Sequence, residues 1–189
     1  QGRDLEDTGW LLALEVEYKR LSDVLTEWKW DNTEWASISA RRKIANVIKN
    51  AWRNSSSVWD VDLRGVYRGQ CIELAGEAFG PELATLPPLP GNFNHVTGVV
   101  LTGCGLTEAS TGFLSTFRNL RALDLSDNSL TRLPPVIEQM PFLEHLLLND
   151  NQIVLTTESV AVLRSKLGMN ALSVEGNPLG QVPDISRMA

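Results

Sequence analysis

The chain has little cysteine, no long apolar segment and no excess of basic residues. Its two cysteines are not grouped in the dense clusters that flank many extracellular repeat domains, which favours a reducing compartment over a disulfide scaffold. No apolar run approaches the length of a membrane span, so we expect no membrane-spanning segment. The formal net charge is −6, which argues against a nucleic-acid-binding surface.

The sequence also lacks the motifs of common catalytic and cofactor sites. It contains no P-loop, no HExxH and no dinucleotide-binding fingerprint, and we expect neither a cofactor nor a metal. His95 and His145 have no cysteine or acidic partner at a recognisable catalytic spacing. The first four residues do not form a signal peptide. These absences favour a binding protein over an enzyme.

The second half of the chain contains one repeated pattern of aliphatic residues and asparagine. Three copies follow the form L-x-x-L-x-L-x-x-N-x-L with aliphatic exchanges, and a fourth, degenerate copy carries cysteine at the asparagine position. The copies begin at Val96, Leu120, Leu143 and Met169, so they are spaced by 24, 23 and 26 residues. This pattern is that of a leucine-rich repeat.

The physics of the repeat predicts a solenoid. Alternating apolar residues form a strand whose inward side chains fill the core, and the asparagine turns inward to bond backbone groups that the bend leaves bare. One copy cannot bury its apolar face, whereas stacked copies share a continuous core. We predict an α/β solenoid of about four or five leucine-rich repeats, with parallel strands on its concave face, over residues 58–182 and a tail at 183–189.

The first third of the chain has a different composition, since it holds all six tryptophans. Apolar residues recur every three or four positions over residues 10–28 and again over 44–52, which is typical of amphipathic helices. Asn32 or Thr33 would cap the second helix. We predict a helical hairpin over residues 1–57 that caps the first exposed end of the solenoid.

Basic residues in and after the second helix leave two readings open. They are Arg41, Arg42, Lys43, Lys49 and Arg53. The reading that we favour is a solvated outer face of a capping helix, and the alternative is a basic docking face.

The segments between the repeat strands differ in their expected conformation. Residues 61–63 and 71–76 alternate like strands. Proline makes residues 85–90 and 133–135 extended. The segment 159–167 is expected to be helical, which accounts for the longest repeat spacing.

Side chains between the buried positions of each strand are expected to point to the concave face. They are Glu73 and Ala75, then Gly98, Val100 and Thr102, then Ala122, Asp124 and Ser126, then His145, Leu147 and Asn149, then Ala171, Ser173 and Glu175. This stripe is small, polar and mildly acidic, with Val100 and Leu147 as exposed apolar points. We therefore predict that it binds a protein with a basic patch. The alternative is that these positions are polar for solubility alone.

Other polar residues of the repeats favour structural roles. Asn128, Asn151 and Asn177 are interpreted as internal hydrogen-bonding residues. Asp127 and Asp150 lie near the rim one repeat apart, and solvation is favoured over a shared cation because no further oxygen ligands are in phase. A small buried thiol at Cys104 is a natural substitute for the asparagine.

The segments 86–90, 96–103 and 123–128 resemble the repeat region of large secreted bacterial effectors and toxins whose repeats precede a NEL-type ubiquitin-ligase domain. The helical lead-in at 40–53 is similar to the segment ahead of those repeats, and the resemblance covers roughly residues 36–182. It implies a domain that selects the host protein to be modified, that is secreted into the host cytoplasm, and that contacts and restrains a downstream catalytic domain.

The resemblance does not extend to catalysis within this chain. The signature of the family is Cys-x-Asp on a helical domain after the repeats, whereas the nearest string here is Cys71-Ile72-Glu73 in a predicted strand. Three hypotheses remain: a non-catalytic recognition module, which we favour, a fragment of a ubiquitin ligase whose cysteine lies past Ala189, and a structural packing domain of a large toxin. Because the chain lacks an initial methionine and ends soon after its last repeat, we expect a fragment.

Overall fold

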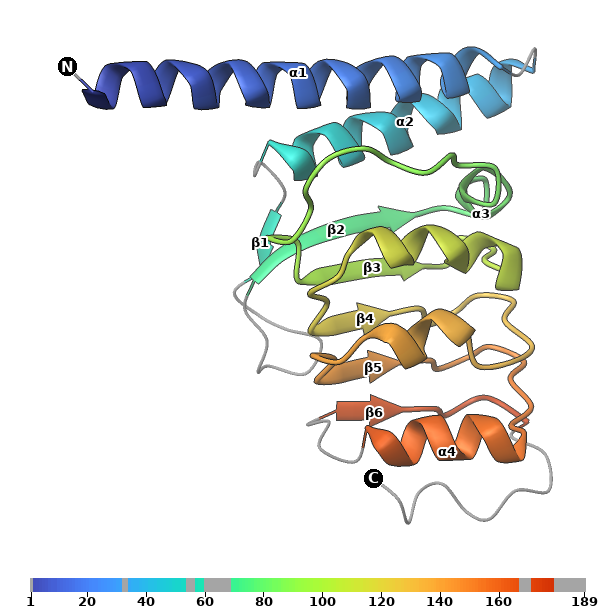
Figure 1. The fold of residues 1–189 in the computed structure, drawn as a ribbon. Helices are drawn as coiled ribbons and strands as arrows, with labels where there is room; N and C mark the ends of the chain where they lie inside the picture. The colour runs from blue at the N-terminus through green and yellow to red at the C-terminus, as the bar shows by residue number, and fades with distance from the viewer. Residues whose placement is uncertain (1, 32–33, 54–56, 60–68, 167–170, 179–189) are drawn as a thin grey trace.

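The computed structural model describes residues 2–31, 34–53, 57–59, 69–166 and 171–178, and places a helical hairpin at one end of a six-stranded sheet (Figure 1). In chain order the elements are α1 (Gly2–Trp30), α2 (Trp35–Trp52), β1 (Ser57–Trp59), β2 (Gly69–Ala75), α3 (Phe79–Leu83), β3 (Gly98–Thr102), η1 (Glu108–Thr116), β4 (Ala122–Asp124), η2 (Pro135–Gln139), β5 (His145–Leu147), α4 (Thr157–Ser165) and β6 (Ala171–Ser173). The strands are ordered in the sheet as they are in the chain. Each connection therefore advances the chain by one strand, as stacked repeats require.

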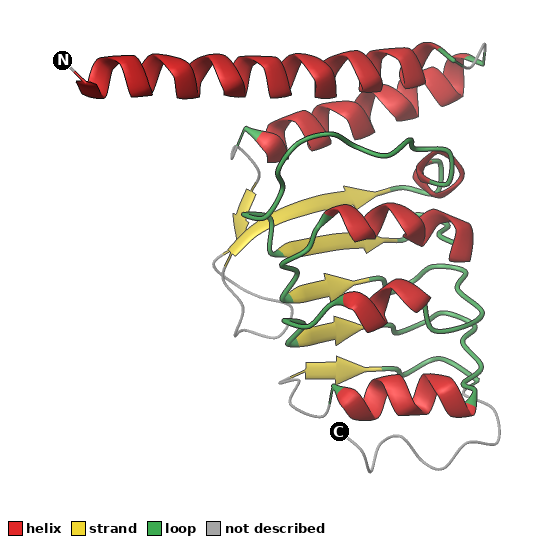
Figure 2. Cartoon of the chain, viewed as in Figure 1, coloured by secondary structure: helices red, strands yellow, loops and turns green. Residues whose placement is uncertain are grey.

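The strands β2 to β6 are parallel, and among the strands that the structure describes only β1 pairs antiparallel, with β2. The register places Val99 opposite Leu123, and Leu123 opposite Leu146, so equivalent positions of the repeated pattern pair with each other. The helices that connect the strands lie on one face of the sheet (Figure 2). None of the described helices covers the opposite face.

The asparagines tie each repeat to the one before it. The Asn128 side chain accepts a hydrogen bond from the Cys104 N–H at 2.9 Å and donates to the Leu101 carbonyl oxygen at 2.7 Å. Asn151 and Asn177 bond in the same way to the preceding repeat. Buried backbone groups that the strand bend would leave unpaired are thus satisfied, and the predicted role of the three asparagines is confirmed.

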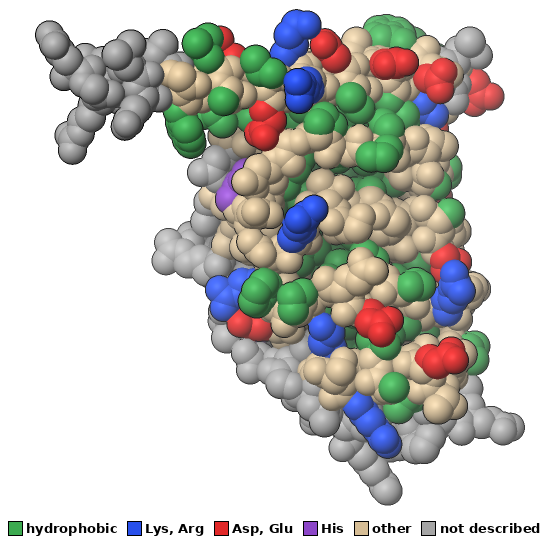
Figure 3. Space-filling view, viewed as in Figure 1, with side chains coloured by type: hydrophobic (Ala, Val, Ile, Leu, Met, Phe, Trp, Pro, Cys, Tyr) green, Lys and Arg blue, Asp and Glu red, His purple; other side chains and the backbone are tan. Residues whose placement is uncertain are grey.

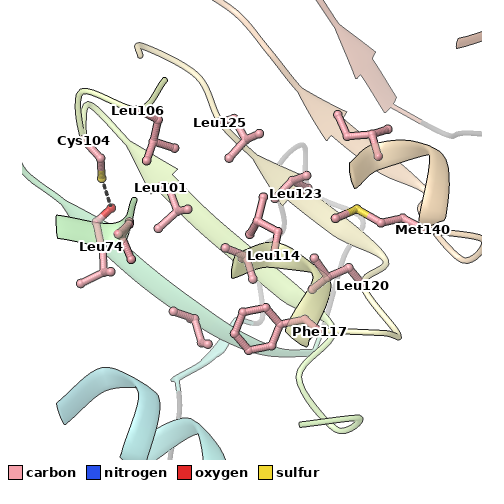
Figure 4. Close-up of a cluster of buried hydrophobic side chains, with 14 of the residues drawn as sticks. Leu74, Leu101, Cys104, Leu106, Leu114, Phe117, Leu120, Leu123, Leu125 and Met140 are labelled. Atoms are coloured by element: carbon pink, nitrogen blue, oxygen red, sulfur yellow. Dashed lines mark hydrogen bonds between the residues drawn. The ribbon is translucent and has the colours of Figure 1, made fainter. Parts of the chain in front are cut away.

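Leucines of successive repeats form a continuous core (Figure 4). Leu101 on β3 and Leu123 on β4 are fully buried, and Leu114 of η1 packs over them from the helical side. Phe117 closes the same layer with its ring edge-on to Phe93, at a centroid separation of 5.7 Å. The predicted packing of aliphatic side chains between repeats is confirmed.

Cys104 occupies the asparagine position of its repeat as a buried thiol. Its Sγ donates a hydrogen bond to the Leu74 carbonyl oxygen at 3.2 Å (Figure 4). Burial raises the pKa of this thiol from 9.0 to about 11. Because the thiolate is the reactive form, Cys104 is a packing residue that is inert at neutral pH.

The two predicted helices are present, and α1 begins earlier than the apolar stripe indicated, at Gly2. Leu21 and Leu25 of α1 pack with Ile44 and Ile48 of α2, and these side chains belong to the same buried cluster as the repeat leucines. Contacts of α2 with β2 and α3 place the hairpin at the first parallel strand. The expected capping residues at 32–33 lie outside the described residues.

Arg41 was predicted to lie on an exposed basic face of α2, and the structure shows that this prediction is wrong. Its side chain is buried, and its Nε atom lies 2.6 Å from Glu82 Oε2. Nη1 donates to the Trp28 carbonyl oxygen at 2.6 Å, and Nη2 donates to Thr85 Oγ1 at 3.2 Å. The sequence pattern missed this site because the ion-pair partner lies 41 residues further along the chain.

The connecting segments follow the sequence in part. The predicted helix at 159–167 is found as α4, which spans Thr157–Ser165. The extended conformation predicted for 133–135 is wrong for Pro135, which is the first residue of the short helix η2. The 85–90 segment is irregular from residue 86, as its prolines require. The helices α3 and η1 were not predicted, and the predicted strand at 61–63 lies outside the described residues, as does the tail at 183–189.

Candidate functional site

The residues predicted for the concave face lie in three rows that cross the strands. The first row holds Gly98, Ala122, His145 and Ala171, the second holds Glu73, Val100, Asp124, Leu147 and Ser173, and the third begins with Ala75 and Thr102 and continues past the strand ends with Ser126, Asn149 and Glu175. Because side chains alternate along a strand, these rows lie between the core positions. The structure therefore brings the predicted residues together on one face of the sheet.

Much of the first two rows is covered, contrary to expectation. The buried members are Gly98, Val100, Ala122, Asp124, His145 and Ser173. Val100 was expected to be an exposed apolar point and is only 5% exposed, so that prediction is wrong. It pairs in register with Glu73 on one side and Asp124 on the other, and strands about 4.8 Å apart let such flanking side chains cover it. Leu147 remains half-buried.

Asp124 is a structural residue rather than a free surface charge. Its side chain is 9% exposed, and Oδ1 accepts hydrogen bonds from the Ser126 N–H at 2.9 Å and the Ser126 hydroxyl at 2.5 Å. A carboxylate that accepts local bonds in this way closes the turn at the end of β4. The predicted role of Asp124 in attracting a partner is therefore corrected.

Glu73 is exposed within β2, and the other accessible carboxylates of this face lie where the strands end. Asp127, Asp150 and Glu175 follow β4, β5 and β6, and all three are exposed. We call these three residues the acidic edge. The Asp127 N–H donates to the Asn149 carbonyl oxygen, and the Asp150 N–H donates to the Glu175 carbonyl oxygen, each at 2.8 Å. Backbone hydrogen bonds between neighbouring repeats thus fix the spacing of the acidic edge.

Two members of the acidic edge have left-handed backbone conformations. The φ angles are 59° for Asp127 and 56° for Asp150, and glycine occupies the equivalent positions 103 and 176 with φ of 63° and 75°. Aspartate is one of the few residues with a side chain that adopts this conformation readily. A Cβ atom at Gly176 would lie 2.2 Å from Asp150 Oδ1, so this carboxylate lies against the turn of the next repeat.

The described residues do not assemble a catalytic or metal centre on this face. No group of three His, Cys, Asp or Glu within the described ranges is placed to hold a metal ion. His95 lies elsewhere, with Nε2 2.5 Å from the Ala51 carbonyl oxygen at the end of α2. Cys71 is buried, whereas Glu73, two residues further along on the same face of β2, is exposed.

The helical side of the sheet carries a second surface that the sequence pattern did not indicate. Figure 3 shows acidic and basic side chains interspersed over this side. Near the strand starts, Phe142 is exposed beside the Arg121–Glu144 ion pair, at 2.8 Å, in an open cleft of about 620 Å³. Mixed charge distinguishes this side from the acidic edge.

Three features define a leucine-rich-repeat region: the parallel strands, the shared leucine core and the inter-repeat hydrogen bonds of Asn128, Asn151 and Asn177, which we call the asparagine ladder. A family model described as leucine rich repeat matches residues 94–153, which include β3, β4 and β5. Repeats of this kind generally act in protein–protein recognition and are typically non-catalytic. No helix within the described residues is both long and apolar enough to cross a membrane.

Among proteins of known identity, the chain is similar to human Vasorin. The two are 38% identical over 88 residues, which make up 44% of this chain and 13% of Vasorin. The chain therefore spans only a small part of the length of that relative. Neither comparison points to the bacterial effectors that the repeat and lead-in segments resemble.

Proposed function

We propose that this region is a non-catalytic protein-recognition module that binds a basic segment of a partner protein along the acidic edge. The observation that supports it is the presence of exposed carboxylates on three consecutive repeat turns, at Asp127, Asp150 and Glu175. Like charges on neighbouring exposed turns repel each other weakly in water, since even a pair about 4 Å apart interacts by only about 1 kcal/mol. Cations from a partner would relieve this repulsion and accelerate association.

Uncharged groups beside the acidic edge extend the proposed contact surface. Thr102, Ser126 and Leu147 are partly exposed in the neighbouring rows. Asn149 Oδ1 has no hydrogen-bond partner among the described residues. It is an acceptor that an arginine or lysine donor would satisfy after a small side-chain movement. The proposed ligand is therefore a basic segment with at least one apolar side chain for Leu147.

The proposal concerns the repeat region and not the setting that the family resemblance implied. A bacterial origin, a host target and a contact with a downstream ligase domain find no support in the match to human Vasorin. Both cysteines are buried, and burial raises the pKa of the Cys104 thiol, which disfavours a nucleophilic role. Neither cysteine of this chain is therefore proposed as a catalytic nucleophile.

The proposal is tested by neutralising two members of the acidic edge. The probe is a synthetic peptide of alternating arginine and leucine, and its affinity is measured by fluorescence anisotropy at low and high salt. The double variant Asp127→Asn, Asp150→Asn should bind about tenfold more weakly at low salt, because two charge contacts are lost. Asparagine tolerates the left-handed conformation, so the turns are retained.

A matched control distinguishes the loss of specific contacts at the acidic edge from the effect of a changed net charge. Glu138 and Glu158 are exposed on the helical side, and changing both to Gln alters the net charge by the same amount. This control should bind the peptide as the unaltered chain does. Equal weakening by both double variants, or no weakening by the first, would refute the proposed surface.

A further inference from the structure

Helix α1 is much longer than the helix on which it packs. It has 29 residues and α2 has 18, which corresponds to a difference in length of about 16 Å. Figure 1 shows the N-terminal part of α1 extending past α2 and the sheet. Four exposed large hydrophobic side chains lie on this overhang, at Trp10, Leu11, Leu12 and Val16. Of these four side chains Trp10 lines the cleft described next, together with the half-buried Leu14.

An open cleft of about 570 Å³ lies where the overhang meets the end of α2. Trp10 and Leu14 of α1 line one part of it, and Trp52 and Arg53 at the end of α2 line another. His95, from the loop before β3, lines it as well. The volume is within the usual range for a site that accepts several ligand groups.

The wall of the cleft is held in place by contacts between α1 and α2. Trp52 Nε1 donates to Glu17 Oε2 at 2.6 Å, and the Trp52 ring centroid lies 5.4 Å from that of Tyr18. The Arg53 guanidinium lies 4.3 Å from the centroid of the Tyr18 ring and also donates to its hydroxyl. The Glu17 carboxylate is thus directed to Trp52, and the exposed Arg53 side chain presents the charge that a ligand would meet.

We propose that this cleft binds an amphipathic helix of another protein, with its apolar face on Trp10 and Leu14 and an acidic side chain next to Arg53. The site continues an interface that already exists within the chain. Leu21 and Leu25 of the same helical stripe are buried against α2, whereas Leu14 is half-buried and Trp10 is 68% exposed where α2 has ended. A docked helix would occupy the place that a longer α2 would take.

Because Arg53 is positively charged, we expect the docked helix to carry acidic residues beside its apolar face. The Arg53 guanidinium stacks on Tyr18, so a carboxylate of the ligand gains a planar, positioned partner. A lysine at the same place would be repelled. The predicted ligand therefore differs from the basic segment proposed for the acidic edge, and the two sites are tested independently.

The test uses the full chain and two synthetic helical peptides of about 18 residues, long enough to form a helix on binding. Both carry leucine at heptad positions a and d, and the flanking residues are glutamate in one and lysine in the other. The glutamate peptide should bind at least about tenfold more tightly than the lysine peptide, as measured by isothermal titration calorimetry. Arg53→Glu should reverse this preference.

Variants of α1 locate the peptide on the cleft. Trp10→Ser and Leu14→Ser should each weaken binding of the glutamate peptide about tenfold. Leu12→Ser is the matched control, because Leu12 is an exposed leucine of α1 that does not line the cleft, and it should leave the affinity unchanged. An equal loss in Leu12→Ser, an unchanged preference in Arg53→Glu, or no binding of the glutamate peptide would overturn the proposal. A dimer in light scattering that Trp10→Ser abolishes would also overturn it, since the occupant would then be a second copy.

Discussion

The Arg41 Nε atom lies 2.6 Å from Glu82 Oε2, and both side chains are buried between α2 and α3. Arg41 also donates to the Trp28 carbonyl oxygen and to Thr85, and its guanidinium lies 5.0 Å from the centroid of the Trp28 ring. One side chain therefore connects α1, α2 and the segment that follows β2. This cluster fixes the helical hairpin on the first repeat.

Removing one member of the ion pair should lower stability strongly. In Glu82→Ala the Arg41 charge stays buried without its carboxylate, and we expect the free energy of unfolding to fall by about 3–5 kcal/mol. Urea denaturation followed by tryptophan fluorescence measures the change. The double variant Arg41→Met, Glu82→Leu should lose less than Glu82→Ala alone. A greater loss in the double variant would contradict the assignment of this cost to an unpaired charge.

Replacing an asparagine of the ladder should lower stability, whereas replacing an exposed asparagine outside it should not. Asn128→Ala leaves the Cys104 N–H and the Leu101 carbonyl oxygen without their side-chain partner. Each buried group left unpaired costs about 1–3 kcal/mol. Asn50→Ala, at an exposed position of α2, should not lower the free energy of unfolding. Similar losses in both variants would mean that the ladder contributes nothing specific.

Cys104 predicts a decline in stability at alkaline pH. Its folded-state pKa is raised from 9.0 to about 11, so the folded state holds this proton more tightly than the unfolded state. The resulting contribution is present below pH 9 and is lost as the pH rises towards 11, by up to about 3 kcal/mol. Comparison of the unaltered chain with Cys104→Val over this pH range isolates the thiol. Identical pH profiles would show that the thiol makes no such contribution.

The left-handed turn at Asp127 predicts a graded response to substitution. A β-branched residue cannot adopt a φ of 59° without a steric clash, so Asp127→Val should lower the midpoint of thermal unfolding and cost about 1–2 kcal/mol. Asp127→Gly and Asp127→Asn tolerate the conformation and should change stability little. If all three variants lost the same stability, the loss would come from removal of the Asp127 carboxylate and not from strain in the backbone.

The repeated pattern predicted the strands, their register and the asparagine bonds because these depend on local spacing. Leu123 pairs with Leu146 as equivalent positions of the pattern require. The burial of Arg41 was not predictable in this way, since Glu82 lies far along the chain and on an unpredicted helix. Periodicity indicates which side of an element a residue occupies, and it does not indicate what the folded chain brings against that side.

The same limit applies to the candidate binding face. Alternation placed Val100 and Asp124 correctly on one face, but it did not show that the neighbouring strands and the Ser126 turn cover them. The exposed carboxylates of Asp127 and Asp150 depend on left-handed turns. The signal that could have found these turns is that either glycine or aspartate directly precedes the asparagine position in all four copies.

The most direct test of the proposed recognition surface is amide hydrogen exchange with and without the bound arginine–leucine peptide. We predict slower exchange in the turns at residues 126–128, 149–151 and 175–177, next to the acidic edge, and no change in η1, η2 or α4. Slower exchange confined to η1, η2 and α4, with the three turns unchanged, would contradict the account.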